Sequence, residues 1–208
     1  MKVYIVGEDD ATKEIIRKII NYCGNKIEII TELPARGGQL KSKIKEFNVL
    51  SKAFPVILLT DLDNNDCPTT LIKSWNIVDK NDKFMINIAV DEAEAWLMAD
   101  RESFAKYFHV KEDLIPTSHK TKLNGPHYTT EMNFPYKASL YLNSKIIPES
   151  TDMAIRQQML PTNGSVKGRE YNVIVIPYIK KHWNIDKAIS NSDSLRRMVN
   201  KIKEWSEL

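Results

Sequence analysis

The feature that most constrains the fold is an apolar run that ends in acidic residues. Val56-Ile57-Leu58-Leu59 follows Pro55 and leads through Thr60 into Asp61-Leu62-Asp63. Four consecutive apolar residues predict a strand buried on both faces, which is typical of central strands in parallel sheets. The sequence therefore predicts an α/β fold with a pair of carboxylates where this strand ends.

Strands and amphipathic helices alternate along the first half of the chain. Further strands are expected at Lys2–Val6, Lys26–Thr31 and Lys83–Val90, and helices after Asp9 or Asp10, from about Leu40 to Leu50, and over Pro68–Ile77. This alternation predicts a mostly parallel sheet flanked by helices. The loop Arg36-Gly37-Gly38 lacks a Walker-type lysine, which favours a plain connection over a phosphate site.

Acidic residues directly follow three of the predicted strands. They are Glu8, the pair Asp61 and Asp63, and the group Asp91-Glu92 with Glu94. Ligands of parallel sheets bind beyond the carboxyl ends of the strands, so these acids are expected at one edge. If the strand stays extended to Asp63, both aspartates leave the same face, where a divalent cation would relieve their repulsion. Turn formation and helix capping are the alternative roles for such acids.

The second half of the chain is less regular. Proline and glycine punctuate residues 111–165, where only Pro135–Leu142 and Thr151–Met159 suggest helices. A closing amphipathic helix is expected from Ser192 to Trp205, docked on the sheet. We therefore expect an α/β core over residues 1–110 and, over residues 111–208, an insert or cap followed by a helical segment that packs on the core.

Composition excludes several classes of protein. Apolar residues make up 42% and charged residues 27% of the 208, which is ordinary for a globular protein. No apolar run reaches membrane length and no signal-peptide pattern opens the chain, so we expect a cytoplasmic protein without a membrane partner. Cys23 and Cys67 lack the spacing of metal ligands and are expected to be small buried residues.

Two motifs resemble those of the Toprim (topoisomerase–primase) fold. That fold is recognised by a glutamate after the first strand and an Asp-x-Asp after the third. In Val6-Gly7-Glu8-Asp9-Asp10, Glu8 falls on the glutamate position, and Asp61 and Asp63 fall on the metal-binding pair. The sequence departs from the pattern at Asp9, where a glycine is usual, and at Ala11-Thr12, where an acidic or small pair is usual.

A third stretch narrows the resemblance. Asp91–Asp100 is similar to a Glu-x-Glu-x-Trp-Leu-x-x-Asp motif in a family of small bacterial Toprim-like proteins, which are associated with phage defence or mobile elements. The resemblance covers residues 1–108. The tail matches loosely through Lys167–Asn172 and Ser192–Arg197.

The resemblance implies a metal-dependent nuclease. Asp61 and Asp63 would hold Mg²⁺ or Mn²⁺, and Glu8 would bind the metal or act as a general base. Similarity to overcoming-lysogenization-defect nucleases implies a second metal near Glu92 and Glu94. Such nucleases act on DNA or RNA, in some cases beside a partner ATPase.

The tail is expected to supply the phosphate contacts. Lys167 or Arg169 is our candidate for the cation that neutralises the scissile phosphate. With a net charge of only +3, the chain should bind nucleic acid weakly, and its affinity should fall with salt.

Two other functions remain open from the sequence. A catalytically inactive Toprim-like subunit could serve in interaction or regulation. A receiver-like signalling module also uses acids after the first and third strands to bind Mg²⁺. However, the Lys-Pro that a receiver carries after its fifth strand is not found.

Overall fold

The computed structural model describes residues 1–24, 26–35, 38–63, 65–123, 125–162, 165 and 167–207. They form two compact units, Met1–Val90 with Arg197–Leu208, and Asp91–Arg196. The structure thus divides at Val90, whereas the sequence placed the boundary at residue 110. The connection expected at Arg36 and Gly37 lies outside the described residues.

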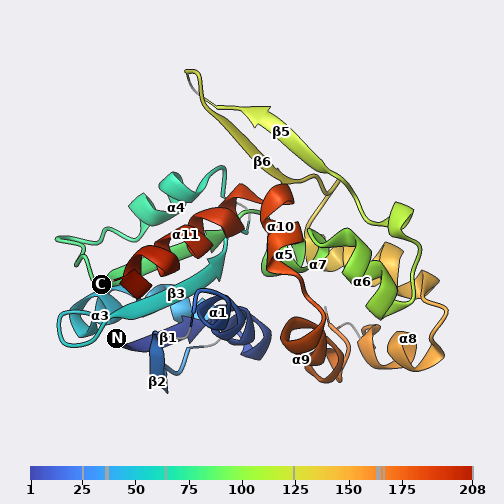
Figure 1. The fold of residues 1–208 in the computed structure, drawn as a ribbon, viewed down its shortest axis with the longest axis horizontal. Coiled ribbons are helices and arrows are strands. Elements are labelled where there is room, and N and C mark those ends of the chain that lie inside the picture. Colours follow the sequence, from blue (N-terminus) through green and yellow to red (C-terminus); the bar gives the residue numbers. More distant parts are fainter. Residues whose placement is uncertain are drawn as a thin grey trace. The chain divides into compact units, whose positions relative to one another are not determined.

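The first unit is built on a four-stranded parallel sheet in the order β2-β1-β3-β4 (Figure 1). Its strands are β1 (Lys2–Gly7), β2 (Glu28–Glu32), β3 (Val56–Asp61) and β4 (Phe84–Ala89). Every residue of β4, and all of β3 except Asp61, is buried. The predicted α/β fold with a parallel sheet flanked by helices is therefore confirmed.

Helices of the first unit cover the sheet. They are α1 (Asp10–Tyr22), α2 (Gly38–Ser42), α3 (Ile44–Leu50), α4 (Pro68–Ser74) and the part of α11 (Asp193–Glu207) that begins at Arg197. The single helix expected from Leu40 to Leu50 is divided at Lys43, whose N–H donates to the Leu40 carbonyl at 3.1 Å in a turn.

The two faces of the sheet carry separate apolar sets, because successive side chains of a strand point to opposite faces. One face packs with α2, α3 and α4 in a cluster that includes Leu58, Ile86, Leu40, Phe47 and Leu71. Helix α1 lies against β1 and β3 and buries Ile15, Ile16, Ile19 and Ile20. In α11, Lys201 Nζ donates to the Ile86 carbonyl at 3.3 Å, so this closing helix docks on β4.

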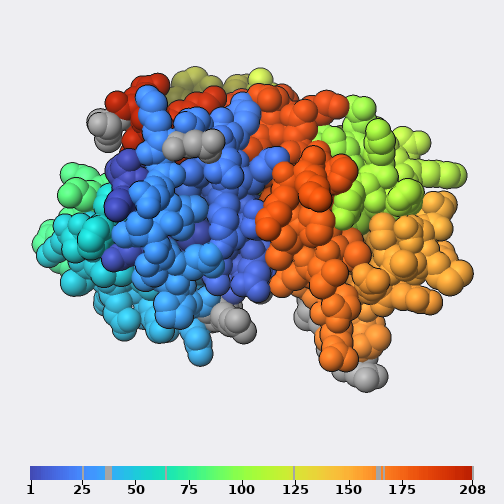
Figure 2. Space-filling model, turned by 60° about the horizontal axis from the view of Figure 1, so that its bottom comes forward, coloured from blue at the N-terminus to red at the C-terminus, as the bar shows by residue number. Residues whose placement is uncertain are grey.

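The second unit is mostly helical. Its helices are α5 (Ala93–Met98), α6 (Arg101–Phe108), α7 (Ala138–Tyr141), α8 (Met153–Met159), α9 (Tyr171–Lys181), α10 (Ile185–Asn191) and the first residues of α11. Short 3₁₀ turns lie at Glu112–Leu114 and Ile147–Glu149, and a π-helical turn at Leu142–Ile146. Helices α8 and α9 lie side by side (Figure 2).

The second unit also contains an antiparallel hairpin that the sequence did not predict. Strands β5 (Ser118–Lys122) and β6 (Tyr128–Met132) pair along their whole length. Glu131 anchors the hairpin, because its carboxylate accepts from the Ser194 N–H at 2.7 Å and the Ser192 hydroxyl at 2.7 Å. A hairpin alone is marginally stable, so this anchor fixes its base.

Aromatic side chains form the core of the second unit. Trp96, Phe104, Phe108 and Tyr178 are almost fully buried. Two of them also use their polar atoms, since Trp96 Nε1 donates to Ser194 Oγ at 2.8 Å and the Tyr178 hydroxyl to the Leu97 carbonyl at 3.1 Å. A buried Trp N–H or Tyr O–H usually needs such a hydrogen-bond partner.

The cysteines differ from expectation. Both are free thiols and both are partly exposed instead of buried. Cys67 caps α4, because its Sγ accepts from the Thr70 N–H at 3.4 Å. Among the described residues, no helix is long and apolar enough to cross a membrane.

Candidate functional site

Glu8 lies one residue past β1, and its carboxylate reaches the end of β3. Its Oε1 accepts hydrogen bonds from the Thr60 hydroxyl and, at 3.1 Å, from the Asp61 backbone N–H. Gly7 makes the approach of β1 to α1 possible, because a Cβ there would lie 2.6 Å from Thr12 Oγ1. The glutamate after the first strand is thus held at the carboxyl end of the third.

Asp9 is used by the helix that follows. Its carboxylate accepts from the Thr12 N–H at 2.8 Å, and its own N–H donates to Thr12 Oγ1 at 3.0 Å. This reciprocal pair is a capping box, which stabilises the start of α1. The two departures from the Toprim pattern, at Asp9 and at Thr12, are therefore partners in one local structure.

Asp61 and Asp63 do not share one face of a strand, which corrects the expectation. Strand β3 ends at Asp61, and Asp63 has a left-handed backbone with φ 52°. The intervening Leu62 is buried and donates its N–H to the Ala89 carbonyl at 2.9 Å. An aspartate tolerates the left-handed turn that follows. The Asp63 carboxylate forms an ion pair with Lys41 of α2.

The carboxylates at the carboxyl ends of β1 and β3 suit a hard cation, except Asp63. Mg²⁺ is commonly bound through one or two carboxylates and completed by water. Glu8 and Asp61 supply two such residues at adjoining strand ends, whereas Asp63 is engaged by Lys41. Among the described residues, no group of three or more His, Cys, Asp or Glu side chains is already arranged to hold a metal.

Glu92 and Glu94 belong to the second unit, and both are buried there. Glu92, at the N-cap of α5, accepts from the Ser139 N–H at 2.7 Å and lies 3.5 Å from Lys137 Nζ. Glu94 accepts from the Tyr171 hydroxyl at 2.8 Å and lies 2.7 Å from Lys167 Nζ. Each carboxylate therefore has a lysine and a neutral donor.

Asp91 precedes this pair and has a raised pKa. Burial, and then repulsion from Glu92, raises the pKa of Asp91 to about 6. The backbone N–H of Ala138 and the charge of Lys137 oppose the shift, while Glu94 adds to it. Asp91 also has a left-handed backbone, with φ 66°.

Lys167 and Arg169 have different surroundings. Lys167 Nζ lies over the Tyr171 ring at 4.6 Å while it pairs with Glu94. Gly168, between them, packs tightly on the end of α8, where a Cβ would lie 2.4 Å from the Met159 carbonyl. The Arg169 side chain is 93% exposed, and its nearest carboxylate, on Glu170, is 3.9 Å away.

The predicted residues thus fall into two sets, one in each unit. The structure brings Glu8 to Asp61 in the first unit, and Glu94 to Lys167 in the second. Sequence reasoning missed the residues that hold these acids, which are Thr60, Lys41, Lys137, Ser139 and Tyr171. Tyr171 alone had a local signal, because it lies within the Lys167–Asn172 stretch.

Comparison with known proteins gives one match. The model of a family described as "Domain of unknown function (DUF4276)" matches residues 6–203. No curated protein matches the chain. No solved structure matches it either.

Proposed function

The chain belongs to the DUF4276 family, and we propose that it is a nuclease that hydrolyses phosphodiester bonds of DNA or RNA with Mg²⁺ or Mn²⁺. The observation that carries the proposal is the contact between the Glu8 carboxylate and the end of β3 at Asp61. Parallel sheets bind ligands beyond the carboxyl ends of their strands. The resemblance to Toprim nucleases supports the same residues.

The chain's own residues have defined tasks in this proposal. Glu8 and Asp61 would hold the ion through carboxylate oxygens, which suit hard cations. Thr60 and the Asp61 N–H orient Glu8 by donating to its Oε1. The other carboxylate oxygen would bind the ion or accept the proton of a water. When bound, the ion supplies positive charge for the phosphate oxygens.

The proposed phosphate contacts, Lys167 and Arg169, both belong to the second unit. Arg169 is exposed and free to meet a phosphate without giving up a buried contact. Lys167 would have to leave Glu94 to do the same. A role in phage defence beside a partner ATPase is supported by the resemblance alone, as is a second metal at Glu92 and Glu94.

A second candidate is a catalytically inactive interaction subunit. The Lys41–Asp63 ion pair favours it, because one of the two expected aspartate ligands is already neutralised. A receiver-like module gains no such support. The sheet of the first unit has four strands among the described residues, and the receiver lysine would follow a fifth.

Cleavage assays on matched variants test the proposal. Plasmid, single-stranded DNA and tRNA would be incubated with Mn²⁺ and wild type, Glu8→Gln, Asp61→Asn or Asp79→Asn. Asp79→Asn is the control, because it removes an equal charge at a distant place. Asp79 is exposed and precedes β4, so it lies at the opposite edge of the sheet. The cleavage rates of Glu8→Gln and Asp61→Asn should be about 100-fold or more below that of wild type, since each change removes several kcal/mol of transition-state charge stabilisation. The control should keep the wild-type rate.

Two outcomes would overturn the proposal. Cleavage that survives in both Glu8→Gln and Asp61→Asn would remove these residues from the site. Absence of cleavage by wild type on all three substrates, with Mn²⁺ bound, would leave the interaction subunit as the better description.

A further inference from the structure

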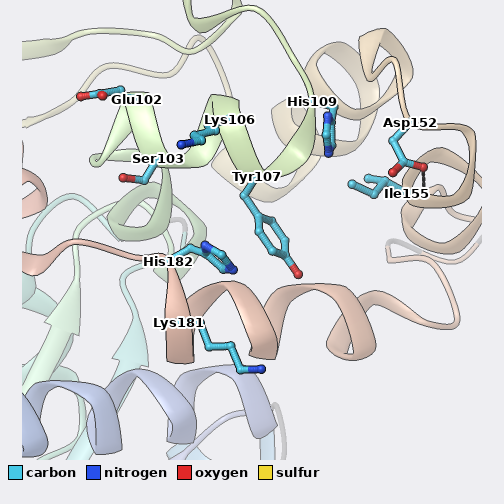
Figure 3. Close-up of a pocket in the computed structure, with 9 residues that line it drawn as sticks. All are labelled: Glu102, Ser103, Lys106, Tyr107, His109, Asp152, Ile155, Lys181 and His182. Atoms are coloured by element: carbon cyan, nitrogen blue, oxygen red, sulfur yellow. Dashed lines mark hydrogen bonds between the residues drawn. The ribbon is translucent and has the colours of Figure 1, made fainter.

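A cleft of about 650 Å³ opens within the second unit. Figure 3 shows its walls, formed by α6, the turn at His109, the start of α8 and the end of α9. Ligand sites in proteins commonly have volumes of roughly 300–1,000 Å³. The cleft shares no residue with the acids discussed above.

An aromatic pair lines one wall of the cleft. The rings of Tyr107 and His182 lie 4.8 Å apart between centroids at an angle of 41°. The Tyr107 hydroxyl donates to the Ile174 carbonyl at 3.1 Å, and its ring also packs on Phe108 and Tyr178. Tyr107 is therefore fixed by its neighbours, whereas His182 is exposed. The exposed imidazole of His182, backed by the Tyr107 ring, is therefore the surface on which a flat ring can stack.

The lysines of the cleft form no ion pair with its acids. Lys106 and Lys181 are exposed and form no ion pair within the described part of the chain. Glu102 instead pairs with Lys187. Asp152 caps α8, where it accepts from the N–H groups of Ala154 and Ile155. The lining thus contains two lysines and two carboxylates. Lys187, outside the lining, compensates Glu102, which leaves the cleft a small excess of positive charge that favours anions.

We propose that this cleft binds a short segment of single-stranded nucleic acid. An unpaired base would stack on His182, which Tyr107 supports from behind, and flanking phosphates would lie on Lys106 and Lys181. Aromatic stacking beside a cationic groove is how proteins hold single strands without sequence preference. The inference rests on the proposed nuclease function for its choice of nucleic acid, and it adds that the strand must be unpaired.

A simpler role for the lysines makes a different prediction. Lys106 and Lys181 lie in the last turns of α6 and α9, where the helix dipole favours cations. That role would stabilise the helices but would not require an aromatic pair beside them. Replacing the lysines would then lower stability and leave nucleic-acid binding unchanged.

Fluorescence anisotropy of labelled 12-mer oligo(dT) and oligo(U) tests the inference with the full chain in EDTA, where no cleavage occurs. The double variant Lys106→Gln/Lys181→Gln should bind at least 10-fold more weakly. The slope of log affinity against log salt concentration should become shallower by about 1.4 in this variant. Each phosphate contact to a single strand contributes about 0.7 to that slope, and two contacts are removed. His182→Ala should weaken binding about 5-fold or more with little change in salt dependence, since stacking is worth ~1–3 kcal/mol per base.

A matched control separates the cleft from the overall charge. Lys111→Gln/Lys145→Gln removes two exposed lysines of the same unit outside the cleft, and should change the affinity less than 2-fold. Equal losses in the two double variants would overturn the inference, as would a duplex of the same length binding as tightly as the single strand. Competition by UMP at equal molar concentration would show a mononucleotide site instead of a strand site.

The outcome is independent of catalysis. Loss of oligonucleotide binding in the cleft variants, in a protein that never cleaves, would retain this inference and reject the nuclease. Normal cleavage of single strands by the cleft variants, with unchanged affinity, would retain the nuclease and reject the binding of single strands in the cleft.

Discussion

Replacing Asp91 by asparagine should stabilise the protein at neutral pH. The folded chain raises the pKa of Asp91 to about 6, chiefly by burial and by repulsion from Glu92, whereas an unfolded aspartate has a pKa of about 3.9. The folded state therefore binds the proton of the Asp91 carboxyl more tightly than the unfolded state does. Stability should fall as the pH rises from about 4 to about 6, and should then level off.

The magnitude follows from the two pKa values. The two pKa values differ by about two units, and each unit corresponds to about 1.36 kcal/mol, which gives about 3 kcal/mol in total. The carboxyl is only half-buried, so solvent screening reduces this to about 1–2 kcal/mol. Asparagine keeps the shape and the oxygen that accepts from Ala138, and it tolerates the left-handed backbone at φ 66°.

Urea unfolding of wild type and Asp91→Asn between pH 4 and pH 8, in EDTA, measures the effect. The two proteins should have similar free energies of unfolding near pH 4, and the variant should be more stable by about 1–2 kcal/mol above pH 6.5. A variant that is equally or less stable than wild type at pH 7, or a difference that does not change with pH, would refute the reasoning.

Three further changes test other contacts. Gly7→Ala should lower the free energy of unfolding by about 1–3 kcal/mol, because its Cβ would meet Thr12 Oγ1 at 2.6 Å; an unchanged urea midpoint would contradict this. Tyr171→Phe removes the hydroxyl that donates to the buried Glu94 and should cost about 1.5–3 kcal/mol by the same assay; a cost below about 0.5 kcal/mol would show that the contact is weak. Lys41→Met should tighten Mn²⁺ binding about 3-fold or more in calorimetry, since Asp63 then lacks its cation; unchanged affinity would exclude Asp63 as a ligand.

The parallel sheet could be predicted because its signals are local. The apolar runs of β3 and β4 match the buried strands closely, and Gly7-Glu8 marks the end of β1. The hairpin had no such signal. Strand β5 reads Ser-His-Lys-Thr-Lys, without an apolar residue, and Glu131 of β6 is fixed by serines more than 60 residues away. Tertiary contacts determine the conformation of the hairpin, and the β-propensity of its residues does not predict such contacts.

The same distinction explains the outcome at the candidate site. Glu8 was expected near Asp61 because parallel strands end at one edge, and the structure places it there. The turn at Asp63 depends on a left-handed backbone that an Asp-x-Asp string permits but does not announce. Partners of Glu92 and Glu94, namely Ser139 and Tyr171, lie 47 and 77 residues away. No local pattern could have paired them.

Charge compensation distinguishes the two sets of acids. Glu94 is 5% exposed and pairs with Lys167, and breaking a buried pair by removing one partner costs about 3–5 kcal/mol. A cation that takes the place of Lys167 must therefore repay this cost before it contributes affinity. Glu8 is held by two neutral donors, and no lysine or arginine pairs with it within the described ranges. An incoming metal ion would meet an uncompensated carboxylate at Glu8 and a compensated one at Glu94, so the first ion should bind at the end of β3.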